Sequence, residues 1–220
     1  MAPDATLVGK VTIGAQSSVW YGATLRGDVS SITVGENVTI GDRVMVHCSS
    51  FPRELPTKIE NNVVVGAGAI LHGCTVCEGA VIGEGAQVMD GAVVEKHAVV
   101  APGAVVSPGK VVAAKTLFAG VPATLVRALT AEEIAAQTLL VQENATLAAV
   151  HAEEQGKSWQ AIESEELLRE QVQERNVEYY RRVDEQELQQ KAGEVENHTV
   201  PGRIFDSAIS ARTHPLSVDK

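Results

Sequence analysis

The stretch Val76–Val112 reads V-C-E-G-A-V-I-G-E-G-A-Q-V-M-D-G-A-V-V-E-K-H-A-V-V-A-P-G-A-V-V-S-P-G-K-V-V, and an aliphatic residue returns in it at every sixth position. These positions are Val76, Ile82, Val88, Val94, Val100, Val106 and Val112. A period of six fits neither an α-helix nor the simple alternation of a β-strand. It fits a short strand followed by a tight turn, in which one aliphatic side chain per unit points into a narrow prism.

The same spacing continues upstream, with interruptions. It is kept by Leu7, Ile13, Val19 and Leu25, by Val34, Ile40 and Val46, and by Ile59, Val65 and Leu71. Three units make one coil of 18 residues, so the 17 positions predict five to six coils. An ordinary β-sandwich with glycine-rich turns would not explain seven positions at strict spacing. The sequence therefore predicts an all-β fold, a parallel β-helix of hexapeptide repeats over residues 1–125. Known β-helices of this kind wind left-handed and commonly trimerise, and the resemblance to them implies a left-handed, trimer-forming solenoid.

Two histidines fall into register once the repeat is counted. The step from Val46 to Ile59 contains a polar, proline-bearing insertion of seven residues, which predicts a loop. Without that loop, Val46 and Leu71 lie one coil apart, and a histidine directly follows each of them. His47 and His72 should therefore stack on adjacent coils, about 4.8 Å apart. Two imidazoles at this separation can bind one metal ion; the alternative is two surface histidines that share a register by accident.

Composition excludes several classes of function. The net charge of −10 argues against nucleic acid or an acidic membrane as the main partner. Three cysteines form an odd set that fits a reducing compartment. No apolar run is long enough to span a bilayer, so we expect no transmembrane segment. The first residues show neither a signal peptide nor a presequence, which indicates either a cytosolic protein or a processed or truncated chain.

The last third of the chain changes character. Thr130–Glu133 has the form of a capping box and predicts a helix that runs to about Gln155. Its expected inner face consists of Ile134, Val141, Ala145, Ala148 and Ala152. A second charged helical segment is expected at about 164–188, so that helices occupy 126–192 and an extended tail occupies 193–220. This extra length suggests contacts beyond a trimer; a disordered acidic tail is the alternative.

Residues 3–130 resemble the gamma-class carbonic anhydrases. The segment S-S-V-W-Y-G-A-T-L-R-G-D-V-S-S-I-T-V-G-E-N-V-T-I-G-D-R-V-M-V-H is similar to the first half of that family. The segment V-V-G-A-G-A-I-L-H-G-C is similar to its second metal-binding segment. Downstream, A-A-V-H-A-E-E-Q-G-K-S-W-Q-A-I-E-S-E-E-L-L-R-E-Q is similar to the helical extension of the mitochondrial members found as subunits of respiratory complex I.

The resemblance implies roles for particular residues. Three histidines bind zinc in this family, and one of them comes from the neighbouring subunit. His47 matches the first ligand and His72 the last, but Ala67 stands where the middle ligand is expected. The other matches are the interface ion pair of Arg26 and Asp28, and Asp42, which corresponds to the Asp before the first histidine. Gly41 stands where many active members have a glutamine.

These matches imply a mainly structural protein. We expect a complex I subunit on the matrix side of the mitochondrial inner membrane, with membrane-arm subunits as partners and a role in assembly. It would form a heterotrimer with gamma-carbonic-anhydrase paralogues and contribute at most half a zinc site, which a neighbour's histidine would complete. The competing hypothesis is an active zinc-dependent carbonic anhydrase. A hexapeptide acyltransferase is a weaker alternative, because A-G-V-P-A is shared with that class.

Two further features have modest predicted roles. Cys74 and Cys77 have C-x-x-C spacing, but no second such pair exists, so we expect packing rather than a redox or metal function. His97 follows Val94 by three residues and is expected to face solvent.

Overall fold

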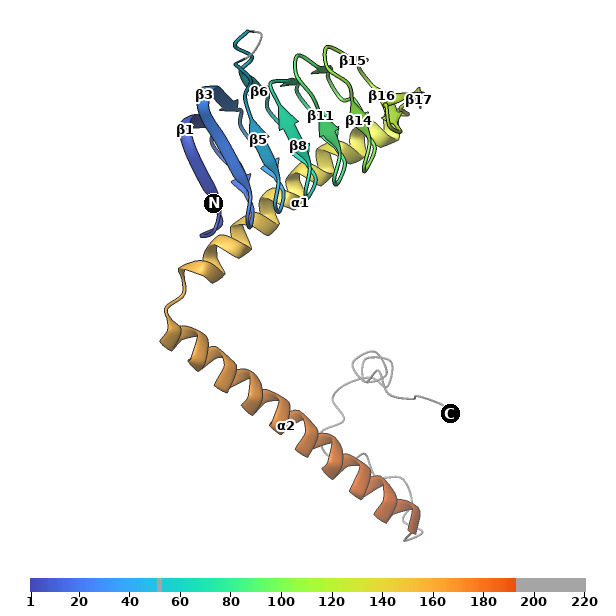
Figure 1. The fold of residues 1–220 in the computed structure, drawn as a ribbon. Coiled ribbons are helices and arrows are strands. Elements are labelled where there is room, and N and C mark those ends of the chain that lie inside the picture. Colours follow the sequence, from blue (N-terminus) through green and yellow to red (C-terminus); the bar gives the residue numbers. More distant parts are fainter. Residues whose placement is uncertain (51–52, 193–220) are drawn as a thin grey trace. The chain divides into compact units, whose positions relative to one another are not determined.

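The computed structural model describes residues 1–50 and 53–192, and its contacts divide the chain into two compact units. The first unit, residues 1–156, holds a parallel β-solenoid and helix α1 (Ala131–Gly156). The second unit begins at Lys157 and contains helix α2 (Trp159–Ala192). Figure 1 shows the short strands of the solenoid stacked side by side in the order of the chain.

The solenoid has three faces, and each coil adds a short strand to each face. The first two faces share a ten-stranded sheet, because β3 is long enough to turn the corner between them. Its strands are β1 (Thr6–Ile13), β3 (Thr24–Val34), β5 (Met45–His47), β6 (Thr57–Ile59), β8 (Ile70–His72), β9 (Thr75–Val76), β11 (Gln87–Val88), β12 (Val93–Val94), β14 (Val105–Val106) and β15 (Val111–Val112). The third face is a seven-stranded sheet of β2 (Ser18–Val19), β4 (Thr39–Ile40), β7 (Val64–Val65), β10 (Val81–Ile82), β13 (Val99–Val100), β16 (Thr116–Ala119) and β17 (Thr124–Ala128). Within both sheets only β16 and β17 pair antiparallel, and this pair closes the C-terminal end.

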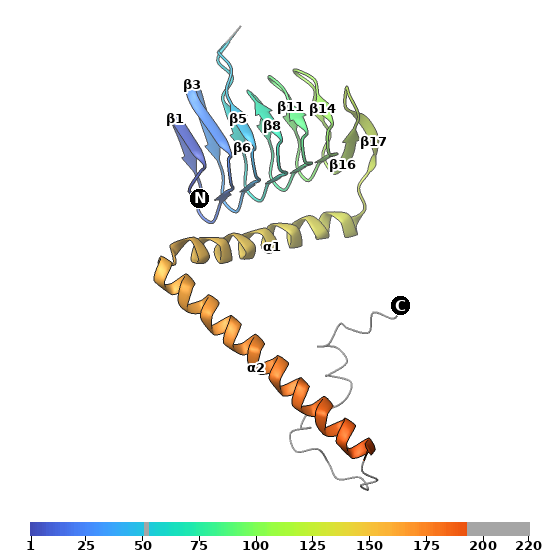
Figure 2. The same ribbon diagram turned by 60° about the horizontal axis from the view of Figure 1, so that its bottom comes forward.

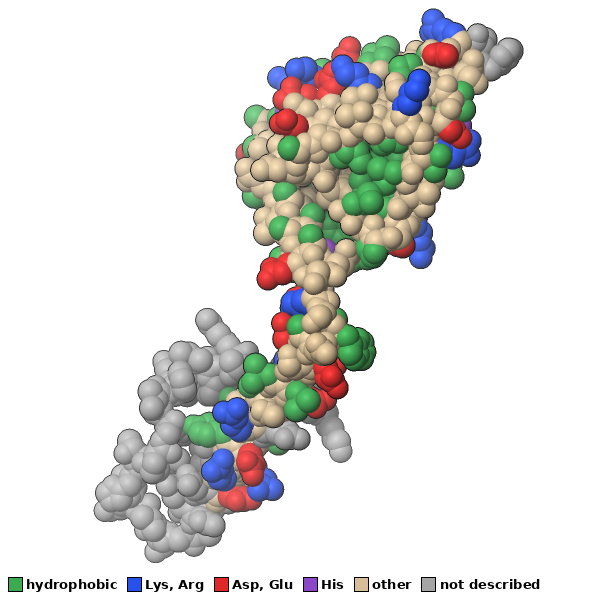
Figure 3. All heavy atoms as spheres, turned by 90° about the vertical axis from the view of Figure 1, so that its left-hand side faces the viewer, with side chains coloured by type: hydrophobic (Ala, Val, Ile, Leu, Met, Phe, Trp, Pro, Cys, Tyr) green, Lys and Arg blue, Asp and Glu red, His purple; other side chains and the backbone are tan. Residues whose placement is uncertain are grey.

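The core confirms the period of six. Of the predicted inward positions, all but Leu7 and Ile13 are buried, and those two pack partly covered against the first coil. A second inward position, two residues earlier in the unit, is small: Ala80, Ala86 and Ala92 are each fully buried. In these coils one branched and one small side chain per unit fill the prism, whereas upstream units carry two branched side chains, such as Val38 with Ile40. At the N-terminal end, apolar side chains gather in the middle of the exposed end face (Figure 3).

Two interruptions of the repeat leave the solenoid at the same corner. Pairing between β1 and β3 shifts after Gly9, so that Asp28, Val29 and Ser30 have no partner on β1 and bulge outward. The insertion after β5 forms a loop whose base is a bridge between Ser49 and Leu55. Both features follow the first face and flank the histidines considered below.

Helix α1 begins with the predicted capping box. The hydroxyl of Thr130 accepts a hydrogen bond from the Glu133 backbone N–H at 3.2 Å, and the Glu133 carboxylate accepts one from the Thr130 N–H at 2.9 Å. Arg127 donates to both oxygens of that carboxylate, at 2.7 and 2.8 Å. The helix then runs back along one corner of the solenoid (Figure 2). It ends at Gly156, as the sequence predicted.

The capping ion pair should make the anchoring of α1 sensitive to acid. The hydrogen bonds from Arg127 and the Thr130 backbone lower the pKa of Glu133 from 4.5 to about 2. A lowered pKa means that this stabilisation is present above pH 4.5 and is lost as the pH falls toward 2. We expect the acid-induced loss of α1 helicity, followed by circular dichroism, to begin at higher pH in Arg127→Gln. In Glu133→Gln the loss should become less dependent on pH, and an unchanged profile in both variants would contradict the assignment.

The inner face of α1 is more polar than predicted. Val141 is buried, and Ile134, Ala145 and Ala148 are partly covered, but Ala152 is exposed. Gln137, which the sequence analysis did not select, is also buried. The reason is that α1 packs on a corner of turn residues rather than on an aliphatic sheet face.

Helix α2 is longer than the predicted 164–188, because it extends to Trp159 and Ala192. Trp159 is 75% exposed. The predicted extended tail, 193–220, lies outside the described residues. Among the described residues, no helix is long and apolar enough to cross a membrane.

Candidate metal centre

His47 and His72 stack as the coil arithmetic predicts. They are register partners at the ends of β5 and β8, and their ring centroids lie 5.1 Å apart. Nδ1 of His47 and Nε2 of His72 are 3.1 Å apart and share a hydrogen bond. Both side chains are partly exposed, at 19% and 30%, so the pair is open to solvent. Two imidazoles held this close can bind one ion, once their mutual hydrogen bond is released.

The bulge of β3 places an ion pair beside His47. Arg26 donates from Nε to Asp28 at 3.0 Å, and its Nη2 lies 3.1 Å from His47 Nε2. The Asp28 carboxylate lies 3.2 Å from the same ring nitrogen. Desolvation opposes ionisation of Asp28, but the His47 hydrogen bond and the Arg26 charge outweigh it and lower the pKa of the carboxyl. The predicted interface pair thus exists within one chain and holds the outer side of the His47 ring.

On its other side the histidine pair is held by Asp90, which the sequence analysis missed. The Asp90 carboxylate accepts a hydrogen bond from Nδ1 of His72. With that proton on Nδ1, His72 Nε2 is an acceptor for the Nδ1–H of His47, and His47 Nε2 is left to accept from Arg26. This set of neutral tautomers leaves out the Asp28 contact, because a carboxylate can bond His47 Nε2 only when that nitrogen carries a proton. A carboxylate on the far nitrogen is the usual way to orient a metal-binding histidine.

Removing the Asp90 carboxylate should release His72. In Asp90→Ala we expect the Nε2–H tautomer of His72 to gain population, because nothing then holds the proton on Nδ1. Long-range ¹⁵N–¹H spectra of the metal-free protein measure this directly. Wherever the pair takes part in a complete zinc site, the same change should weaken zinc binding about 10–100-fold. Glu84→Ala, one hexapeptide earlier, is the matched control, and an equal shift in that variant would contradict the role of Asp90.

The remaining predicted residues lie at a different corner. Ala67 and Asp42 occupy successive turns between the third face and the first face, where the Asp42 carboxylate accepts from the Tyr21 backbone N–H at 3.1 Å. Ala67 is exposed there. From Ala67 to His72 the chain runs five residues along the first face, a distance of about 16 Å. One chain therefore cannot bring position 67 to its own histidine pair.

The backbone of the next coil leaves no room for a side chain at Gly41. A Cβ atom added to it would lie 2.8 Å from the carbonyl oxygen of Val65 and 2.9 Å from the amide nitrogen of Ala67. Since these contacts are with backbone, a larger residue requires the turn to shift. The glycine at this position is thus part of the stacking of the coils.

The two cysteines with C-x-x-C spacing, Cys74 and Cys77, both have raised thiol pKa values. Burial raises the pKa of the Cys74 thiol to about 12, which favours packing over redox or metal chemistry. Desolvation, with Glu60 and Glu95 nearby, also raises the pKa of Cys77. Among the described residues, no cluster of three or more His, Cys, Asp or Glu side chains could hold a metal ion.

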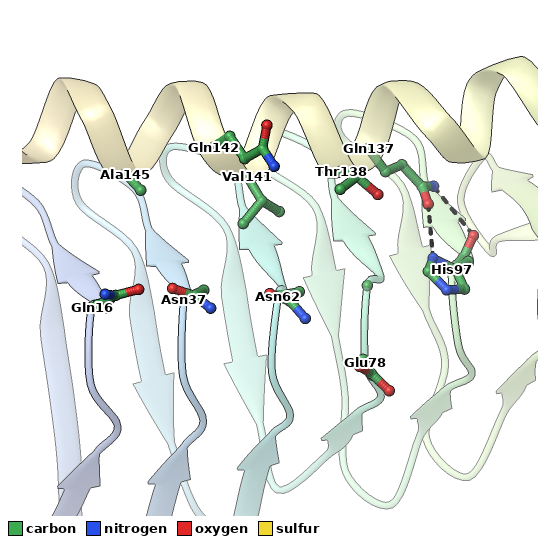
Figure 4. Close-up of a pocket in the computed structure, with 11 residues that line it drawn as sticks. Gln16, Asn37, Asn62, Glu78, His97, Gln137, Thr138, Val141, Gln142 and Ala145 are labelled. Atoms are coloured by element: carbon green, nitrogen blue, oxygen red, sulfur yellow. Dashed lines mark hydrogen bonds between the residues drawn. The ribbon is translucent and has the colours of Figure 1, made fainter.

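The sequence analysis expected His97 to face solvent, but in the structure its side chain is partly buried. Its Nδ1 lies 3.3 Å from the Gln137 carboxamide oxygen, and its carbonyl accepts from Gln137 Nε2 at 3.2 Å. Figure 4 shows both contacts beneath α1. His97 is one of a row of corner residues with positive φ, together with Asn37 and Asn62, over which α1 lies. The prediction was wrong because it counted position along the solenoid alone and left out the helix that returns along it.

Comparison with known proteins supports the family resemblance found in the sequence. Gamma carbonic anhydrases 1, 2 and 3 of Arabidopsis thaliana, all mitochondrial, are 41%, 42% and 47% identical to the chain over 77%, 81% and 76% of its length. A Methanocaldococcus jannaschii protein named "Probable carbonic anhydrase" is 52% identical over 134 residues, 61% of this chain and 82% of that protein. The chain belongs to the gamma carbonic anhydrase family. It spans only 62–66% of the length of the three Arabidopsis relatives.

Solved structures support the fold of this family member. A hexapeptide transferase family protein of Anaplasma phagocytophilum is 36% identical, with a TM-score of 0.61 over 67% of this chain and 89% of that one. No protein-family model matches the chain.

The residues present fit zinc only in part. An imidazole whose second nitrogen donates to a carboxylate, as His72 does to Asp90, is a typical zinc-binding arrangement, and His47 fits it when its Nε2–H is donated to Asp28. A catalytic zinc ion requires three protein ligands and an open position. This chain offers two imidazole ligands, His47 and His72, at one corner and only the methyl group of Ala67 at the other.

Proposed function

We propose that this chain is a mainly structural subunit of a heterotrimer of gamma carbonic anhydrase paralogues in mitochondrial complex I. The observation that carries the proposal is the asymmetry between the two corners. The corner with His47 and His72 is intact and ordered by hydrogen bonds, whereas the corner with Ala67 has lost its ligand. In a cyclic trimer each interface combines one corner of each kind.

The asymmetry sets the zinc content of any trimer. An interface in which a paralogue's histidine meets His47 and His72 has three ligands, and an interface in which Ala67 must donate has two. Trimers with one, two or three copies of this chain should therefore hold two, one or no zinc ions. Bound zinc would lower the pKa of its water, so that hydroxide, the nucleophile for CO2, would be available at neutral pH. The part of this chain in such a site is to hold the ion through two oriented imidazoles.

The relatives support the proposed location. Three of them are mitochondrial by name, and the sequence after residue 130 resembles the helical extension of the complex I branch. We place the protein on the matrix side of the inner membrane, next to the membrane arm. The acyltransferase alternative rests on the A-G-V-P-A segment and on the solenoid that both families share, and no feature of the site favours it over the proposal.

Two measurements test the proposal. This chain is co-expressed with a paralogue that carries histidine at the position of Ala67, and native mass spectrometry counts chains and zinc ions in each trimer. Zinc absent from every interface that contains His47 and His72 would refute the half-site. CO2 hydration by the homotrimer should be negligible, and strong metal-dependent activity would overturn the structural role. A tagged chain recovered from mitochondria should migrate with complex I; recovery as self-trimers alone would contradict that assignment.

A further inference from the structure

Helix α1 is fixed in rotation on the solenoid at three points along its length. Glu133 is clamped by Arg127 at the first turn, and Gln137 is bonded to His97 one turn later (Figure 4). Near the other end the Tyr21 hydroxyl lies 3.1 Å from His151 Nδ1, and the Trp20 and His151 rings pack edge to face at 4.9 Å. The helix therefore presents one defined side to the solenoid and one defined side away from it, as the view in Figure 2 shows.

The side turned away carries a strip of large apolar residues. Leu139, Leu140, Leu147 and Val150 are exposed by 55%, 36%, 48% and 51%. Their spacing places them on one side of the helix, opposite buried Val141, over about three turns or 16 Å. We call Leu139, Leu140, Glu143, Leu147 and Val150 the outer strip. Four aliphatic side chains aligned in this way are typical of a binding surface rather than of scattered surface residues.

The negative charge of the outer strip limits which class of partner can bind it. Glu143 lies in the middle of the strip, one turn from Leu139 and one turn from Leu147, and makes no ion pair within the described part of the chain. Helix α1 contains no lysine or arginine in its 26 residues. Any partner that covers the aliphatic residues also removes Glu143 from water, which is costly unless a cation is supplied. Anionic lipid and the same strip of a second copy would both be repelled.

We propose that the outer strip of α1 is a docking surface for a basic amphipathic helix of another protein. The straight, three-turn apolar stripe fits a helix packed alongside, and Glu143 selects a lysine or arginine at the centre of the contact. This surface lies on the opposite side of α1 from the solenoid and does not depend on the proposed zinc site.

The test uses the full chain and two labelled helical peptides of 14 residues. Both carry a leucine stripe, and their polar positions are lysine in one and glutamate in the other. We expect fluorescence anisotropy to show binding of the lysine peptide only. Leu147→Ala should weaken that binding at least about 10-fold and Glu143→Gln several-fold. Glu153→Gln, which removes the same charge beyond Val150 at the end of the strip, should change it less than about twofold.

Three results would overturn the proposal. One is equal binding of the two peptides, which would indicate apolar association without charge selection. Another is equal weakening by Glu143→Gln and Glu153→Gln, which would indicate attraction to the overall negative charge. The third is stronger binding to vesicles with 30% phosphatidylserine than to the lysine peptide. Because the substituted side chains are exposed, circular dichroism should show an unchanged fold in every variant.

Discussion

Replacing Ala67 by histidine is expected to raise the zinc content of the purified homotrimer from a trace to about one ion per chain. Each interface would then combine the new imidazole with His47 and His72 of the next chain. Position 67 is exposed at its corner, so the larger side chain meets no packed core. The receiving pair must give up its mutual hydrogen bond and the proton within it, but His72 needs no reorientation, since Asp90 already orients its ring.

Metal analysis after dialysis against a weak chelator measures the gain, and light scattering establishes that the protein is a trimer. Zinc at 100 times its dissociation constant should also stabilise the variant by about 2.7 kcal/mol. The control is Ala67→His combined with His72→Ala, which should return zinc to a trace. A trimeric Ala67→His protein without zinc would show that the two corners do not face one another. Gly41→Gln is not a useful addition, because the Val65–Ala67 backbone leaves no room for its Cβ atom.

The parts of the site that follow the repeat could be predicted from the sequence. Counting 18 residues per coil pairs His47 with His72, and the structure confirms the pair. The same count places Asp90 one coil after His72, but Asp90 supports a histidine rather than binding metal directly, so a pattern of metal ligands does not include it. The signal was present in the spacing.

Features outside the repeat were harder to predict from the sequence. The bulge at Asp28 arises because three residues are inserted into β3, and nothing in their types distinguishes a bulge from a longer strand. The inner face of α1 was predicted as a stripe of aliphatic residues, which is correct for a helix on an apolar sheet. Here the helix lies on a corner of polar turn residues, so Gln137 and His151 make contacts in addition to the buried Val141. The identity of the supporting surface, not the pattern of the helix, decides which residues become buried.

Replacing Leu71 by alanine is expected to cost about 2–5 kcal/mol of unfolding free energy, toward the upper end of that range. Leu71 is fully buried at the centre of the prism. The cost depends on how far the surroundings can close the cavity. In this fold the backbone ladders fix the spacing between coils, so the neighbours Val46 and Val88 cannot move inward to fill it.

Urea denaturation followed by the fluorescence of Trp20 measures the loss, in a Trp159→Phe background that removes the second signal. Ile70→Ala, one residue earlier on the same strand with its side chain on the opposite face, is the matched control and should cost roughly 1 kcal/mol. Similar losses in the two variants would show that inward and outward positions are not distinguished by burial. A loss below about 1 kcal/mol for Leu71→Ala would mean that the coils collapse around the cavity. The rigid prism that holds His72 beside His47 would then be the wrong description of this solenoid.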